Sequence, residues 1–131
     1  PANAMSLGFS WGPTKKCFDS KSPPMKLSAV PKGTAKLRFR MVDLDKPDYP
    51  HGGGTVKWTG GANGSLPYGA FRYKGPCPPN PHTYRFTVDA LDASGRKLGT
   101  AQASRCVAHA WYAVYCSMNS LGAIRFAHLA Q

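Results

Sequence analysis

The segment GPCPPNPHTYRFTVDAL, residues 75–91, contains the two features that decide the fold. Its first part has four prolines between residues 75 and 81. Because proline lacks a backbone N–H and fixes φ, this part is expected to be a stiff loop. From His82 to Leu91 apolar and polar residues alternate, which is the period of a strand with one buried face. The segment therefore predicts a rigid loop that leads directly into a long strand.

The sequence on either side predicts further antiparallel strands. Residues 37–42 alternate in the same way and end at Asp43, whereas residues 92–95, Asp-Ala-Ser-Gly, favour a hairpin turn before a returning strand over 97–103. Residues 55–58 are a candidate short strand, and residues 69–73 could pair after it. We expect a loop over 47–54, because three consecutive glycines cost too much backbone entropy for a strand interior.

Length and composition indicate one globular domain over residues 1–131. The 14 glycines and 12 prolines favour a β protein with many loops. We expect residues 1–8 to be flexible, and residues 1–26 show little periodicity. Residues 106–131 form an atypical C-terminal segment, whose short apolar runs fit a helix, a strand or both in turn.

The charge is strongly positive, with 17 Lys and Arg against six acidic residues, all of them Asp, and a net charge of +11. Such a field attracts phosphate, anionic lipid or nucleic acid, although it could also serve only to keep the protein soluble. A nucleic-acid-binding face could be formed by basic residues on neighbouring strands. The residues for such a face are Arg38, Arg40, Lys57, Arg72 and Arg85.

The four cysteines are Cys17, Cys77, Cys106 and Cys116. No Cys-x-x-Cys pair occurs, which argues against a structural zinc site, and the even number fits disulfides formed in an oxidising compartment. Residues 2–4, Ala-Asn-Ala, have the form left by signal peptidase, so we expect a periplasmic or secreted protein rather than a cytoplasmic one. Of the three pairings possible, we expect Cys17–Cys77 with Cys106–Cys116.

Two aspartates and a histidine–tyrosine pair are candidate ligand-binding residues. Asp43 and Asp45 are two apart at a strand end, so both carboxylates could enter one pocket, or they could bind turn amides. His82 and Tyr84 could both donate to an anion on the same side of the next strand. Alternatively, His82 bonds a loop carbonyl and Tyr84 packs in the core.

His51, before the glycine run, is either a ligand-binding residue or an exposed loop histidine. The enzyme motifs Gly-x-Ser-x-Gly and His-Glu-x-x-His do not occur. A Cys77 nucleophile is disfavoured by the surrounding prolines and the expected disulfide, and Asp43 and Asp45 would lie too close together to flank a glycosidic bond. The sequence therefore favours a binding protein with no catalytic residues, metal or cofactor.

Six segments, taken in order, resemble the phosphatidylethanolamine-binding protein family, also called Raf kinase inhibitor-like proteins, and its bacterial branch most of all. They are Cys17 with Ser22-Pro23, Val30–Thr34, Asp43-Leu44-Asp45-Lys46-Pro47, Gly75-Pro76-Cys77-Pro78-Pro79, His82-Thr83-Tyr84 and Ala90–Asp92. The resemblance implies a mainly β fold with a large central antiparallel sheet, a smaller sheet and few short helices. It also implies a small cavity that takes phosphate, phosphorylethanolamine or a similar anion.

The resemblance assigns pocket roles to Asp43, His82 and Tyr84, with Pro76 and Cys77 at the rim. The family usually has a second pocket histidine after the aspartate motif. Here His51 is the nearby candidate, and Lys57 could supply a cation instead.

We therefore expect a non-enzymatic binding protein for a small anion or a phospholipid head group, whose partners could include an anionic membrane surface. One alternative is a protein-interaction module that inhibits a kinase or protease. The other is nonspecific nucleic-acid binding.

Overall fold

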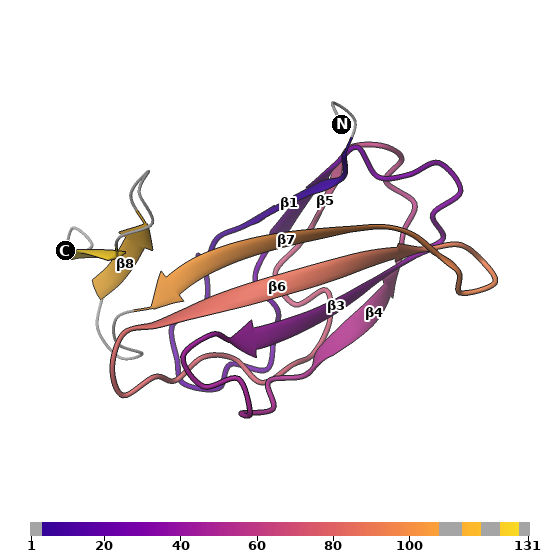
Figure 1. Cartoon of the computed structure of the whole chain (residues 1–131). Coiled ribbons are helices and arrows are strands. Elements are labelled where there is room, and N and C mark those ends of the chain that lie inside the picture. The colour runs from indigo at the N-terminus through magenta and orange to yellow at the C-terminus, as the bar shows by residue number, and fades with distance from the viewer. Residues whose placement is uncertain (1–3, 108–113, 119–123, 129–131) are drawn as a thin grey trace.

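Two antiparallel β-sheets make up the part of the chain that the computed structural model describes, namely residues 4–107, 114–118 and 124–128 (Figure 1). The large sheet has the strand order β4-β3-β6-β7-β8-β9, and the small sheet has the order β1-β2-β5. The strands are β1 (Ser6–Phe9), β2 (Met25–Ser28), β3 (Lys36–Asp43), β4 (Gly53–Lys57), β5 (Gly64–Leu66), β6 (His82–Leu91), β7 (Lys97–Val107), β8 (Val114–Met118) and β9 (Ile124–His128).

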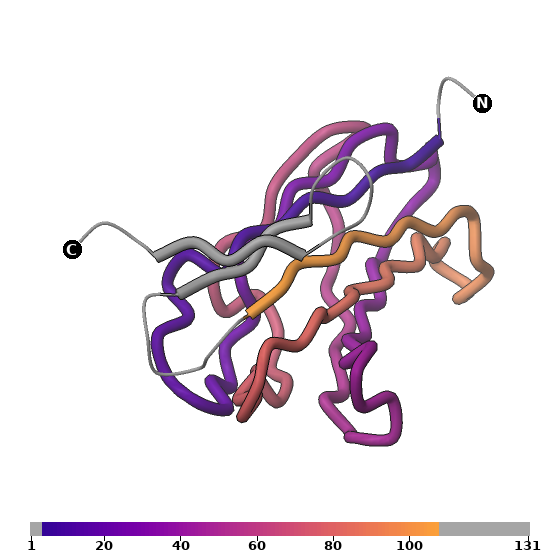
Figure 2. Tube along the Cα trace, turned by 60° about the vertical axis from the view of Figure 1, so that its left-hand side comes forward, coloured from indigo at the N-terminus to yellow at the C-terminus, as the bar shows by residue number. Residues whose placement is uncertain are grey.

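The long strands predicted from alternation are confirmed, but the expectation of one buried face is wrong for β6, where Thr83, Thr87 and Asp89 are buried as well because the strand lies in the middle of the sheet. In β3 the side chains of Leu37, Phe39 and Met41 are buried, whereas Arg38 and Arg40 point to the other face. β6 pairs with β3 on one side and with β7 on the other. The hairpin turn over 92–95 lies at the end of the molecule far from His82, as Figures 1 and 2 show.

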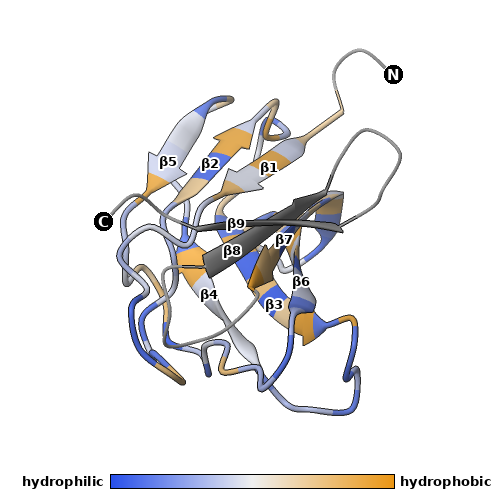
Figure 3. Cartoon of the chain, turned by 90° about the vertical axis from the view of Figure 1, so that its left-hand side faces the viewer, coloured by the Kyte–Doolittle hydropathy of each residue, from blue (hydrophilic) through white to orange (hydrophobic). Residues whose placement is uncertain are grey.

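The small sheet was implied by the family resemblance, but the residue pattern did not predict its strands. β1 includes residues 6–8, which we expected to be flexible. In β2 buried and exposed residues alternate, with Met25 and Leu27 buried, but a strand of four residues is too short for this period to be recognised in the sequence. Figure 3 views the chain from the site end, with β1, β2 and β5 on one side and β3, β4 and β6 on the other.

The core between the sheets is aromatic. The ring of Phe9 meets Phe86 edge-on with centroids 5.0 Å apart, and Trp11 meets Tyr84 in the same way at 5.8 Å. Each such pair contributes about 0.5–1.5 kcal/mol beyond the area that it buries. These contacts fix the N-terminal segment against the first residues of β6, where the candidate site lies.

The expected loop over 47–54 is wrong at its end, because Gly53 and Gly54 belong to the edge strand β4. A Cβ on Gly53 would lie 1.9 Å from the Phe39 carbonyl oxygen, and one on Gly54 would lie 2.8 Å from Cβ of Phe71. Glycine is therefore required by close packing, which outweighs its entropic cost. Residues 69–73 form no strand: Arg72 makes an isolated bridge to Lys21, while the Phe71 ring stacks on Phe39.

The C-terminal segment continues the large sheet through β8 and β9. The few short helices that the resemblance implies do not occur among the described residues. None of the described segments is a helix long and apolar enough to cross a bilayer.

Replacing Gly53 by Ala should therefore destabilise the protein by about 1–3 kcal/mol, because the added methyl group overpacks against the β3 backbone. Gly8→Ala in β1 is the matched control, since no atom lies within 4 Å of a Cβ built there. We expect the control to change the free energy of unfolding by less than about 0.5 kcal/mol. Urea unfolding checks both values, and equal effects of the two substitutions would contradict the packing argument.

Candidate functional site

A cavity of about 250 Å³ lies at the end of the large sheet where β3 ends and β6 begins. Its wall combines aromatic rings, two histidines, a carboxylate and the proline-rich loop. The residues that line it are Phe18, Asp43, Lys46, Tyr49, His51, Cys77, Pro78, Pro79, His82 and Tyr84. The structure thus brings together five of the seven predicted ligand-binding residues, and it leaves Asp45 and Pro76 outside the cavity wall.

Strand pairing explains why distant residues meet here. Asp43 is the last residue of β3, and its register partner is Tyr84 in β6. His82 and Tyr84 are two apart in β6, so their side chains share a side of the sheet, as predicted. The three side chains therefore face one another because β3 and β6 pair in this register.

The Asp43 carboxylate is buried and makes contacts with both oxygens. Oδ1 accepts hydrogen bonds from the N–H groups of Asp45 (2.9 Å) and Lys46 (3.2 Å). Oδ2 lies 2.5 Å from Nδ1 of His82. Asp43 therefore both lines the cavity and binds turn amides: one oxygen caps the turn and the other orients the histidine. A proton on Nδ1 facing the carboxylate leaves Nε2 of His82 for a ligand.

Asp45 has a positioning role. Its Oδ2 accepts a hydrogen bond of 2.7 Å from the N–H of Thr83, which holds the start of β6 to the turn. Asp43, Asp45 and His82 each have an oxygen or nitrogen atom within 4.8 Å of the others. The hydrogen bonds described above already engage Asp43 Oδ1 and Oδ2 and Asp45 Oδ2.

His51 lines the cavity and is only 4% exposed, so the exposed-loop interpretation is wrong. Its Nδ1 donates to the Lys74 carbonyl at 2.6 Å, which leaves Nε2 without a proton when the ring is neutral. Burial lowers the pKa of His51, although the bond to Lys74 and the charge of Asp43 act in the opposite direction. His51 is thus the second histidine of the cavity. Lys57 does not replace it, because Lys57 pairs with Lys36 at the other end of β3.

Tyr84 is both a core residue and a cavity residue. Its side chain is 1% exposed, and its ring packs against those of Trp11 and His51. Its hydroxyl has no hydrogen-bond partner among the described residues. Burial is the main cause that raises the pKa of Tyr84, and the charges of Asp43 and Asp45 add to it. The hydroxyl therefore stays protonated and can donate a hydrogen bond to a ligand.

The predicted Cys17–Cys77 disulfide is confirmed, and Cys77 contributes to the cavity wall. The bond links positions 60 residues apart, and in the chain-entropy model closing such a loop contributes about 4 kcal/mol. Pro76 is buried behind the wall, and its carbonyl accepts a hydrogen bond from the N–H of Phe18. The backbone register places Cys106 opposite Cys116, but the side chain of Cys116 lies outside the described residues.

Sequence reasoning missed Phe18, Lys46, Tyr49, Pro78 and Pro79 as cavity residues. Lys46, Pro78 and Pro79 lie within the motifs Asp43–Pro47 and Gly75–Pro79, so these motifs could have indicated them as cavity residues. Tyr49 precedes His51 by two residues and contacts its ring at 4.7 Å. Phe18 is brought in by the disulfide at the preceding residue, which sequence spacing alone does not place.

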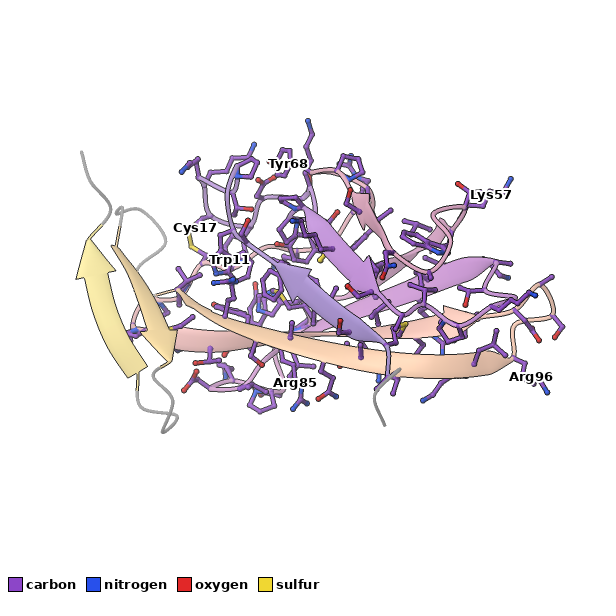
Figure 4. All side chains as sticks on the ribbon, turned by 90° about the horizontal axis from the view of Figure 1, so that it is seen from above. Trp11, Cys17, Lys57, Tyr68, Arg85 and Arg96 are labelled. Carbon is purple, nitrogen blue, oxygen red and sulfur yellow. A yellow bond between two sulfur atoms is a disulfide. The ribbon has the colours of Figure 1, made fainter. Side chains whose placement is uncertain are left out.

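Four of the basic residues proposed for a nucleic-acid-binding face share the outer face of the large sheet by register, namely Arg38, Arg40, Lys57 and Arg85, whereas Arg72 does not. Arg38 and Arg40 both pair with the buried Asp89, at 3.1 and 3.2 Å. Arg72 lies beside Lys21, outside the large sheet. Figure 4 shows Arg85 on the side of the large sheet opposite Trp11, with Lys57 at a distant edge of the molecule.

No family model and no curated protein matches the sequence. Two solved structures have a similar fold. One is a phosphatidylethanolamine-binding protein homologue from Chlamydia trachomatis, with 22% identity, a TM-score of 0.55 and coverage of 79% of this chain and 97% of that one. The other is YbcL from Escherichia coli, a member of the mammalian phosphatidylethanolamine-binding protein family, with 21% identity, a TM-score of 0.52 and coverage of 78% and 96%. The chain therefore has the mainly β fold of phosphatidylethanolamine-binding proteins, as its motifs predicted.

The lowered pKa of His51 predicts how stability depends on pH. Above its ordinary pKa of 6.5 the His51 ring is neutral in both the folded and the unfolded protein, so it does not make the free energy of unfolding depend on pH. As the pH falls below that value the unfolded chain takes up the proton first, so folding loses stability at up to about 1.4 kcal/mol per pH unit.

His51→Asn tests this effect, because the Asn amide can still donate to the Lys74 carbonyl. Urea unfolding at about pH 7.5 and about pH 5.5 should show a larger loss for the wild type than for H51N. The carboxylates and His82 are common to both proteins, so the difference reports on His51. Equal losses would mean that His51 titrates normally.

Proposed function

We propose that this cavity binds the phosphate of a small anion or of a phospholipid head group, phosphorylethanolamine being the model ligand, without catalysing a reaction. The observation that carries the proposal is the pairing of His82 and Tyr84. Their rings lie with centroids 6.3 Å apart, and each has one polar atom that no described residue engages. Two donors that converge on one cavity suit an anion with several acceptor oxygens.

Asp43 supports the anion site indirectly. Its carboxylate accepts a hydrogen bond from Nδ1 of His82 and so orients the ring, and Nε2 can donate to a ligand oxygen when both ring nitrogens carry hydrogens. The negative charge of Asp43 is itself offset by the amides of Asp45 and Lys46. His82 can thus direct Nε2 at a phosphate although the group beside it is an acid.

His51 adds a different function to the same cavity. With Nδ1 bound to the Lys74 carbonyl, Nε2 can accept a hydrogen bond. Its partner would be a phosphate O–H or the ammonium group of ethanolamine. The combination of donors at His82 and Tyr84 with an acceptor at His51 favours a hydrogen phosphate or a zwitterionic head group over a fully ionised anion.

The size of the cavity supports a small ligand. Pockets for drug-sized molecules typically hold about 300–1,000 Å³. The volume of about 250 Å³ here suits a phosphate with a short substituent and is too small for a diacyl lipid. The wall also favours binding over catalysis, because Cys77 is in a disulfide and Asp43 is engaged at both oxygens.

The surroundings of the cavity fit this role. The net charge of +11 raises the local concentration of anions, an effect that salt weakens. The Cys17–Cys77 bond supports an oxidising compartment, so we propose a periplasmic or secreted location.

Titration with phosphorylethanolamine, followed by NMR of the His82 ring, tests the proposal. The ring signals should shift at millimolar ligand or below. His82→Asn retains a donor to Asp43 but removes Nε2, and should weaken binding about tenfold or more, as expected for a charged hydrogen bond. Tyr84→Phe removes only the hydroxyl and should weaken binding about twofold to tenfold.

Lys57→Gln is the matched control, because it removes one charge at the far end of the large sheet. It should bind the ligand like the wild type, apart from a small salt-dependent change. Absence of any shift in the wild type at millimolar ligand would refute the proposed site. So would unchanged affinity in both H82N and Y84F.

A further inference from the structure

The large hydrophobic side chains that are exposed among the described residues are Phe18, at 44%, and Leu44, at 40%. Both lie at the site end of the large sheet. Phe18 lines the cavity, and Leu44 follows Asp43 and donates its N–H to the Thr83 carbonyl at 2.8 Å. Phe18 is thus the exposed apolar side chain at the cavity, whereas Leu44 lies opposite Thr83 on the other face of the sheet.

The backbone holds Phe18 in a costly conformation. Its φ is +54°, in the left-handed region that a bulky residue rarely adopts, at a cost of about 1–3 kcal/mol. The adjacent disulfide at Cys17 and the hydrogen bond to the Pro76 carbonyl keep it there. Burial does not offset this cost, because the side chain is largely exposed. The position therefore suggests that the exposed ring has a use of its own.

Phe18 belongs to a platform of rings and cations. Its ring stacks on that of Tyr49, with centroids 6.2 Å apart and planes within 12°. The Lys74 ammonium group lies 4.7 Å from the Phe18 centroid and 4.9 Å from that of Tyr49. Lys46 lines the same cavity, and Asp48 offsets its charge by pairing with it at 3.4 Å, whereas Lys15 and Lys16 precede Cys17 in the sequence.

This combination matches the surface of an anionic bilayer. Aromatic rings favour the level of the lipid head groups, and lysines are attracted to the negative surface potential. A single exposed ring among lysines also suits lipids, which adapt around it, better than a protein partner, which needs a continuous apolar centre.

The small cavity adds an independent argument. Because about 250 Å³ cannot hold the acyl chains, a phospholipid bound here must keep its chains in the bilayer while its head group enters the cavity. The residues around the mouth of the cavity would then contact the bilayer directly. Those residues, which we call the rim, are Phe18, Lys46, Tyr49 and Lys74.

We infer that the rim docks on anionic phospholipid bilayers and positions the cavity over a head group in the membrane plane. This inference rests on the proposed head-group site and specifies its source: a lipid within a bilayer, not a free phosphate compound. Phe18 acts as the interfacial anchor, and Lys74 supplies the attraction next to it.

Cosedimentation with vesicles tests the inference. The wild type should bind vesicles of phosphatidylethanolamine and phosphatidylserine, more weakly as salt rises, and should bind pure phosphatidylcholine vesicles much less. Phe18→Asn replaces the ring by a polar residue that tolerates the left-handed region, and should weaken binding about tenfold or more. Lys74→Gln should weaken it about fivefold, as expected for one lysine near an anionic surface.

Lys57→Gln is again the control, with the same change of charge at the opposite end of the molecule from Cys17 (Figure 4). It should lower vesicle binding less than K74Q does. Equal binding of the wild type to both kinds of vesicle, binding to neither, or equal effects of F18N, K74Q and K57Q would overturn the inference. Should F18N fail to fold, the comparison of K74Q with K57Q decides the question.

Titration of the same variants with free phosphorylethanolamine separates this inference from the proposed function. K74Q should keep most of the affinity for the free compound while losing most of its vesicle binding, because the Lys74 side chain does not line the cavity. If the wild type binds the free compound but not the vesicles, the docking surface is wrong and the head-group site stands. If it binds neither, both are wrong.

Discussion

The candidate site depends on the buried carboxylate of Asp43, which joins the end of β3 to the start of β6. One oxygen accepts the amides of Asp45 and Lys46 and so closes the turn, while the other lies 2.5 Å from His82 and orients its ring. Because β3 and β6 pair so that Asp43 is opposite Tyr84, the same contact places the histidine and the tyrosine side by side. An unpaired buried charge would be costly, so the hydrogen bonds that stabilise Asp43 also build the cavity.

The parts that could be predicted from the sequence are those that depend on local pattern. Alternation predicted both strands and the buried face of β3, and the shared side of His82 and Tyr84 follows from their spacing, but β6 is buried on both faces and not on one. The glycines of β4 were misjudged because the close approach of Phe39 and Phe71 is a long-range contact. His51 could not be placed for the same reason, since its partner is the carbonyl of Lys74, 23 residues further along the chain.

The disulfide and the proline-rich loop connect the cavity to the rim. Cys77 is part of the cavity wall, and its partner Cys17 precedes the exposed ring of Phe18. A single covalent link therefore fixes a wall of the candidate site and the aromatic residue that faces solvent beside it. The positive charge of the chain acts over longer distances than these contacts and favours the approach of anions. In this account, charge brings the protein to its ligand, and the oriented histidine and tyrosine select it.

The most direct test of the head-group site is a crystal structure of the protein grown with phosphorylethanolamine. We expect the phosphate group inside the cavity, with its oxygens within hydrogen-bond distance of Nε2 of His82 and the hydroxyl of Tyr84. The ammonium group or a protonated phosphate oxygen should face Nε2 of His51. An empty cavity at saturating ligand, or a phosphate bound elsewhere on the basic surface, would contradict the account.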